Sequence, residues 1–142
     1  MVVYLEQIQL YCNKNKIKFT NLRKRIYQII LEQSNPIKAY EILEIFKKEL
    51  PKSRPFTIYR TLDFLIENRL IHKLQNNNSY MICQHPEKKH LGCSIFICQE
   101  CQNISEICNQ NVNLSINQSA KNNNFKINNV TLEIGGICSS CD

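Results

Sequence analysis

The stretch Cys98-Gln99-Glu100-Cys101 and its counterpart Cys138-Ser139-Ser140-Cys141 decide how the second half of this chain folds. Two cysteines separated by two residues can turn both thiolates toward one ion, and two such pairs supply the four sulfurs of a closed tetrahedral zinc site. The interval between the pairs is longer than in an ordinary zinc ribbon, so we expect a small folded unit between them. The alternative, a pair of disulfides, requires an oxidising compartment.

The remaining composition favours an intracellular binding protein. Met1 is followed by a polar, lysine-rich segment without the apolar core of a secretory signal, and no run approaches about 18 apolar residues. We therefore expect a cytoplasmic chain with no membrane span, whose eight cysteines act as metal ligands before they act as disulfides. A thiol-based redox protein is the rival from another class. The chain shows no nucleophile–base set and no glycine-rich phosphate loop, so we expect neither an enzyme nor a small-molecule substrate.

The positive charge is concentrated in the first half of the chain. Residues 1–73 contain 14 Lys and Arg against 7 Asp and Glu, whereas residues 74–142 contain 4 against 5. Solvated lysines explain part of this difference. The rest indicates a polyanion such as DNA as the partner of the N-terminal half.

Helical periodicity and turn residues predict four helices in this basic half. Thr20 is a suitable N-cap for the second helix, in which Leu22, Ile26, Ile29 and Ile30 are expected on the buried face. Arg23 and Lys24 fall in its first turn, where the helix dipole disfavours cations, so both are candidate contacts for an external anion. The helices are expected at 4–13, from Thr20 to Pro36, at 39–50 and at 55–70.

The last two predicted helices, separated by Pro51-Lys52-Ser53-Arg54-Pro55, match a helix-turn-helix. In that motif the second helix presents its N-terminal side chains to base edges in the major groove. Thr57, Tyr59 and Arg60 lie opposite its apolar face, and Arg60 can bind a guanine bidentately or hold a phosphate. The alternative is an ordinary amphipathic helix in which Arg60 pairs with Asp63 or Glu67.

Two short apolar runs, 71–74 and 79–83, flank an asparagine-rich turn and predict a β-hairpin, the wing of a winged helix. The fold class is therefore α+β. It comprises a winged helix-turn-helix domain at 1–83, a linker at 84–91 and a small β-α-β domain, stabilised by zinc, at 92–142. In the last domain we expect strands at 93–98 and 103–108, a helix at 111–123 and a final strand at 125–134.

A second group of metal-ligand types gathers where the two predicted domains join. His72 lies on the wing and Cys83 at its end, His90 lies in the linker, and Glu106 follows the first Cys-x-x-Cys pair. Each residue alone is more often hydrogen-bonded than metal-bound. Together they supply imidazole, thiolate and carboxylate in fourfold number, which suits tetrahedral Zn²⁺ and would fix the orientation of the domains.

Several motifs together resemble the ferric uptake regulator family over nearly the whole chain. They are Thr57-Ile58-Tyr59-Arg60-Thr61-Leu62, the wing and the two Cys-x-x-Cys pairs. Within the family, Phe96-Ile97-Cys98-Gln99-Glu100-Cys101 and Ser105-Glu106 are similar to the zinc-responsive members. The histidine-rich run that precedes the first pair in iron and peroxide sensors is reduced here to Lys88-Lys89-His90. This reduction speaks against both kinds of sensor, and an iron- or peroxide-responsive regulator of the same family is kept as the alternative.

The resemblance implies a homodimeric repressor whose C-terminal domain mediates dimerisation. In its zinc-loaded form it would bind double-stranded operator DNA and repress zinc-uptake genes. The spacing before Cys98 leaves His85 or Cys93 as alternatives to His90, and Cys93 and Cys108 are otherwise expected to be spare thiols. Two zinc ions per monomer are implied, a structural ion on Cys98, Cys101, Cys138 and Cys141 and a regulatory ion on His72, Cys83, His90 and Glu106.

Overall fold

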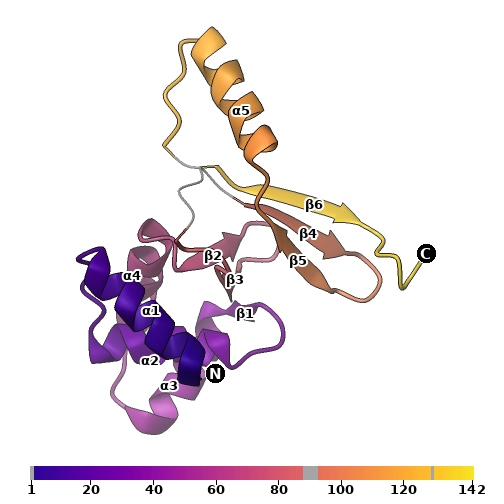
Figure 1. The fold of residues 1–142 in the computed structure, drawn as a ribbon. Helices are drawn as coiled ribbons and strands as arrows, with labels where there is room; N and C mark the ends of the chain where they lie inside the picture. The colour runs from indigo at the N-terminus through magenta and orange to yellow at the C-terminus, as the bar shows by residue number, and fades with distance from the viewer. Residues whose placement is uncertain (1, 88–92, 129) are drawn as a thin grey trace. The chain divides into compact units, whose positions relative to one another are not determined.

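The computed structural model describes residues 2–87, 93–128 and 130–142 (Figure 1). The chain forms two compact units, Met1–Pro86 and Glu87–Asp142. The division between them falls within the segment 84–91 that was expected to be a linker. No helix in the described ranges is long and apolar enough to cross a membrane.

Four helices build the N-terminal unit, as the periodicity predicted. Thr20 caps the second of them, where its hydroxyl accepts the backbone N–H of Arg23 at 3.4 Å. Pro55 occupies the first turn of the fourth, a position where its missing N–H is not needed. The helices are α1 (Val2–Lys14), α2 (Asn21–Leu31), α3 (Ala39–Glu49) and α4 (Pro55–Glu67).

The core of this unit lies between the four helices and one face of a small sheet. On α2 the expected buried face is confirmed at Ile26, Ile29 and Ile30 but not at Leu22, whose side chain is 37% exposed. Tyr27, which was not assigned to that face, is fully buried. Leu22 belongs to the first turn of α2, and helical periodicity gives its direction without showing whether another element covers it. The fully buried side chains with the largest volumes are Tyr27, Phe46, Ile26, Ile29, Ile42, Ile58, Leu62, Leu65, Leu70, Ile71 and Leu74.

The predicted wing is confirmed as an antiparallel hairpin of β2 (Ile71–Leu74) and β3 (Ser79–Ile82). Asn78, at the end of the connecting turn, has a positive φ of 52°, a conformation that asparagine tolerates better than most residues. A third strand, β1 (Ile37–Lys38), pairs with β3 and gives the order β1-β3-β2. This strand was not predicted, because two residues carry no periodicity.

The C-terminal unit contains β4 (Ser94–Cys98), β5 (Ile104–Ile107), α5 (Gln110–Asn122) and β6 (Leu132–Gly136). Its sheet has the order β5-β4-β6, in which β4 is antiparallel to β5 and parallel to β6. The predicted order of elements is confirmed, and with it the α+β fold class. The final strand is shorter than predicted and begins at Leu132, so residues 125–128 and 130 lie outside it.

Very little of the C-terminal unit is buried within the chain itself. Among its described residues Ile95 is the only fully buried aliphatic side chain, and α5 buries none. Such a small core does not stabilise a domain of this size without additional ties. Its large exposed apolar side chains are Phe96, Ile107, Leu114, Phe125, Ile134 and Ile137.

Candidate metal centre and nucleic-acid interface

The two Cys-x-x-Cys pairs meet at one end of the C-terminal sheet. Cys98 ends β4 and Cys101 lies in the turn that follows, whereas Cys138 and Cys141 lie in the turn after β6. The parallel register places Cys98 beside Gly136, and the Gln99 N–H donates to the Gly136 carbonyl at 2.8 Å. Pairing of β4 with β6 is therefore what brings the two halves of the cluster together.

The four sulfurs are arranged closely enough to share one ion. All four Sγ atoms lie within 4.8 Å of one another, and the Cys101 and Cys138 sulfurs are 3.7 Å apart. In a tetrahedral site with Zn–S bonds of about 2.3 Å, the sulfurs are separated by about 3.8 Å. Four thiolates in this geometry select zinc or a related thiophilic metal, so the donor set fits Zn²⁺.

Backbone N–H groups prepare one of these sulfurs to carry negative charge. Hydrogen bonds from the Cys101 N–H and then the Cys138 N–H lower the pKa of Cys98 to about 6, and the second of these donors lies 3.4 Å from the sulfur. At Cys141, by contrast, hydrogen bonding with the Cys101 thiol raises the pKa to about 12. Neighbouring thiols do not all ionise without a cation between them, so metal binding here would release protons.

The residues expected at the second metal site are found in both units. In the N-terminal unit, ligand atoms of His72 on β2 and Cys83 just after β3 lie within 4.8 Å of one another. Cys83 is fully buried, and its carbonyl accepts the Tyr4 hydroxyl at 3.1 Å. Glu106 lies on β5 of the C-terminal unit and is 8% exposed. His90 lies outside the described residues.

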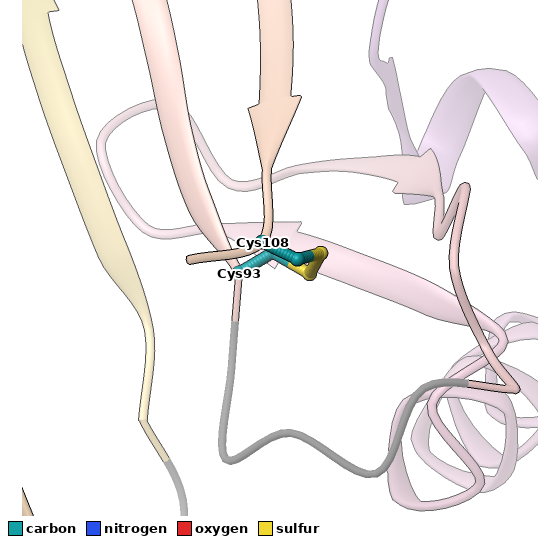
Figure 2. Close-up of a disulfide and its surroundings, with 2 residues drawn as sticks. All are labelled: Cys93 and Cys108. Atoms are coloured by element: carbon teal, nitrogen blue, oxygen red, sulfur yellow. A yellow bond between two sulfur atoms is a disulfide. The ribbon is translucent and has the colours of Figure 1, made fainter. Parts of the chain in front are cut away.

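Cys93 and Cys108 form a disulfide where β4 begins and β5 ends (Figure 2). The expectation that both are spare thiols is therefore wrong, and in this bonded state Cys93 does not replace His90 as a ligand. The register pairs Ser94 with Ile107, which places the two cysteines opposite each other one step further along. The sequence contained this signal, because the first predicted strand of the hairpin begins at Cys93 and the second ends at Cys108.

Helix α4 presents a polar and aromatic face to solvent. Phe56, Tyr59 and Arg60 are exposed and Thr57 is half-buried, while Ile58 and Leu62 on the opposite side belong to the core. The described residues contain no ion pair between Arg60 and either carboxylate of its own helix. The alternative in which Arg60 pairs with Asp63 or Glu67 is therefore wrong, and the guanidinium of Arg60 can bind an external partner.

The basic first turn of α2 is largely satisfied inside the N-terminal unit. The Arg23 guanidinium donates to the Lys18 carbonyl at 2.6 Å, and its central carbon lies 3.4 Å from the centre of the Phe64 ring on α4. Arg25 donates to the Glu49 carboxylate at 2.9 Å. Lys24 is half-exposed on the same turn. Arg23 thus fastens α2 to α4, a packing role that its sequence position did not indicate.

Comparison with known proteins agrees with this architecture. The sequence model of the ferric uptake regulator family matches residues 14–135. The zinc uptake regulation protein of Escherichia coli K12 is 28% identical over 137 residues, which cover 96% of this chain and 80% of the relative.

Two solved structures are also similar over most of their length. A zinc uptake regulator complexed with zinc and DNA has a TM-score of 0.87 at 28% identity, with 97% of this chain and 92% of that chain covered. The holo form of XcZur has a TM-score of 0.86 at 30% identity, with 98% and 96% covered. The resemblance stated from the motifs is confirmed, and a transcription regulator is shown rather than an enzyme. This chain belongs to the ferric uptake regulator family.

Proposed function

We propose that this chain is a zinc-responsive repressor that acts in the cytoplasm, binds operator DNA as a zinc-loaded homodimer and represses zinc-uptake genes. The observation that carries the proposal is the likeness, over nearly the whole chain, to a zinc uptake regulator complexed with zinc and DNA. The donor set and the exposed face of α4 supply the corresponding chemistry in this chain.

The proposed structural zinc is held by the four-cysteine cluster. Its support is the separation of 3.7 Å between the sulfurs of Cys101 and Cys138, close to that of a tetrahedral zinc site. An ion there would join the turn after β4 to the turn after β6. That tie would compensate for the small core of the C-terminal unit, because structural zinc contributes about 10–16 kcal/mol at neutral pH.

The proposed regulatory zinc, the second per monomer, uses His72, Cys83, His90 and Glu106. The proximity of the His72 and Cys83 ligand atoms and the burial of the Glu106 carboxylate support this assignment. A buried carboxylate is a favourable ligand because it has already lost much of its hydration. In this proposal the wing supplies two ligands, His72 near its start and Cys83 at its end. The linker supplies His90, and the C-terminal unit supplies Glu106.

The exposed apolar face of the C-terminal sheet supports a homodimer. Phe96, Ile107 and Ile134 come from the three strands and line one shallow depression together with Ile137. A second copy of this chain would cover these side chains with the same surface, as in an isologous dimer. Full burial of an exposed side chain of this size contributes about 1.5–3 kcal/mol, and because these side chains are already partly buried, covering each would add about half of that.

We propose α4 as the recognition helix, with Thr57, Tyr59 and Arg60 as base and phosphate contacts. Tyr59 and Arg60 are exposed and Thr57 is half-buried on one side of a helix whose other side is fixed in the core, which supports this assignment. Lys24 is a proposed phosphate contact. Arg23 is also part of the proposed DNA interface, where its main role is to hold α2 against α4 through its contact with Phe64.

Zinc would act by shifting a population of conformations. Without the regulatory ion the winged helices would sample many orientations about the linker, and with it the two recognition helices of a dimer would stand about one turn of DNA apart. Moving a competent form from about 1:99 to 99:1 requires about 5.5 kcal/mol of differential binding. A four-ligand zinc site supplies more than that.

The test is the zinc content of protein purified without added metal, before and after mild chelation, with binding to operator DNA measured at each stage. We expect about two ions per monomer falling to about one, with the dimer retained and DNA binding lost.

Cys83→Ser should abolish the zinc response, whereas Cys12→Ser, which also replaces a fully buried thiol of the same unit, should retain it. A normal zinc response in Cys83→Ser would refute the regulatory site. Recovery of DNA binding with Fe²⁺ but not Zn²⁺ would favour the iron-responsive alternative.

A further inference from the structure

Where β4 begins and β5 ends, the C-terminal sheet brings together three side chains of metal-binding type that do not belong to the four-cysteine cluster. They are Cys93, Glu106 and Cys108. Because Ser94 pairs with Ile107, Cys93 stands opposite Cys108, and Glu106 precedes Cys108 by two residues and so lies on the same face. One ligand atom from each of these three residues lies within 4.8 Å of the other two. This part of the sheet therefore holds two sulfurs and a carboxylate on adjoining strands.

The strand pairing keeps the two cysteines adjacent whether or not they are bonded. Their Cα atoms are 4.6 Å apart, the spacing of a close pair in an antiparallel ladder, and hydrogen bonds between β4 and β5 maintain it. Cys93 is buried and Cys108 is half-buried, so Cys108 is the more accessible end of the bond for a small thiol. In the reducing compartment proposed for this protein, a bond of this kind is transient.

We propose that Cys93, Cys108 and Glu106 form a third cation site, for a thiophilic divalent ion such as Zn²⁺ or Cd²⁺, that exists only after the disulfide has been reduced. Two molecules of a low-molecular-weight thiol reduce the bond by exchange and leave as their own disulfide, and two cysteine thiols remain. The ion then displaces one proton from each thiol and binds both sulfurs and the carboxylate. In the oxidised state neither sulfur is a thiolate, and the site is absent.

The geometry requires little movement of the backbone. The sulfurs must separate to about 3.8 Å to share a tetrahedral ion with bonds of about 2.3 Å, a change that side-chain rotation provides while both Cα atoms stay in the sheet. Glu106 supplies the third ligand from a buried position, and water completes the four. Two sulfurs and one oxygen suit zinc-like ions better than the oxygen-loving Mg²⁺.

The site would share Glu106 with the proposed regulatory ion, so the two ions would compete for that carboxylate. We would therefore measure it in the Cys83→Ser chain, which lacks a proposed regulatory ligand, by titrating Cd²⁺ and following the ultraviolet charge-transfer band of cadmium bound to thiolate. Reduced Cys83→Ser protein should bind about one more ion per chain than the same protein oxidised by a small disulfide. The additional ion should contribute the band of two further thiolates.

Three further variants in the same background distinguish the site from the four-cysteine cluster. Replacing Cys93 and Cys108 together by serine should remove the additional ion, whereas Cys12→Ser should retain it. Glu106→Gln leaves both thiols in place and should weaken binding of that ion at least tenfold. Equal Cd²⁺ content in the reduced, oxidised and double-serine proteins would overturn the proposal. If the double-serine variant does not fold, two other results together would overturn the proposal. These are an unchanged Cd²⁺ affinity in folded Glu106→Gln protein and equal Cd²⁺ contents in the reduced and oxidised proteins. The zinc response of DNA binding in the unmodified chain reports separately on the proposed function.

Discussion

Replacing Cys141 by serine should unfold the C-terminal unit and leave the N-terminal unit intact. Among the described residues of the C-terminal unit, Ile95 is the one fully buried aliphatic side chain, and its burial contributes about 1.5–3 kcal/mol. Ordering the backbone of a single residue costs about 1–2 kcal/mol, so this burial offsets the ordering of only one or two residues. The proposed zinc, at about 10–16 kcal/mol, would be the larger contribution. Removing one of its four sulfurs should therefore expose most of the sheet.

Hydrogen exchange followed residue by residue is the appropriate assay, because it reports on the two units separately. In the Cys141→Ser protein, amides of β4, β5 and β6 should lose their protection and the zinc content should fall. Amides of α2, α3 and α4 should exchange as before, since their core contains no cysteine of the cluster. The matched control is Ser140→Ala, which alters the neighbouring residue of the same turn without removing a ligand.

Unchanged protection of β6 in the Cys141→Ser protein, with unchanged zinc, would refute the reasoning. It would mean that the dimer contact or the strand pairing alone stabilises the C-terminal sheet. Loss of protection in α2 to α4 as well would contradict the separate stability of the N-terminal core.

Three further predictions concern the N-terminal unit. Arg60→Ala should weaken operator binding by about 1–3 kcal/mol without changing zinc content, and Lys121→Ala, which removes one positive charge from α5, should have a much smaller effect in the same gel-shift titration. Leu62→Ala should destabilise the unit by about 2–5 kcal/mol in urea denaturation, because Leu62 is fully buried. The hydrogen bond from Arg25 holds the pKa of Glu49 below its usual value, so this pair stabilises the fold above the carboxyl's unfolded pKa and the benefit is lost as the pH falls through the folded one. Glu49→Gln should therefore reduce the dependence of the melting temperature on pH on the acid side.

The order of elements was predictable because it depends on local signals. Thr20 as a cap, Pro55 at a helix start and the asparagine turn before Ser79 all act within a few residues, and each functions as expected. The spacing of the Cys-x-x-Cys pairs likewise predicted a common cluster before any strand pairing was known.

What the sequence did not predict depends on contacts between distant segments. The packing of Arg23 on Phe64 requires the relative placement of α2 and α4, which neither helix encodes alone. The pairing of Cys93 with Cys108 depends on hairpin register, and a shift by one residue would have turned their side chains to opposite faces. The ligand roles of His72, Cys83, His90 and Glu106 remain predictions, because they require residues of two units and a segment outside the described ranges.

The parallel pairing of β4 with β6 also affects the rate at which the C-terminal unit folds. These strands are joined through β5 and α5, so the chain must close a long loop before Gly136 can lie beside Cys98. Contacts this distant in sequence form slowly, since the entropy of loop closure is lost before they stabilise the chain. A zinc ion bound early by Cys98 and Cys101 would have two free coordination positions. Once β6 pairs with β4, Cys138 and Cys141 would fill these positions and the ion would hold β6 in place. Zinc would in this way influence how quickly the C-terminal unit folds, in addition to its proposed effect on DNA binding by the folded protein.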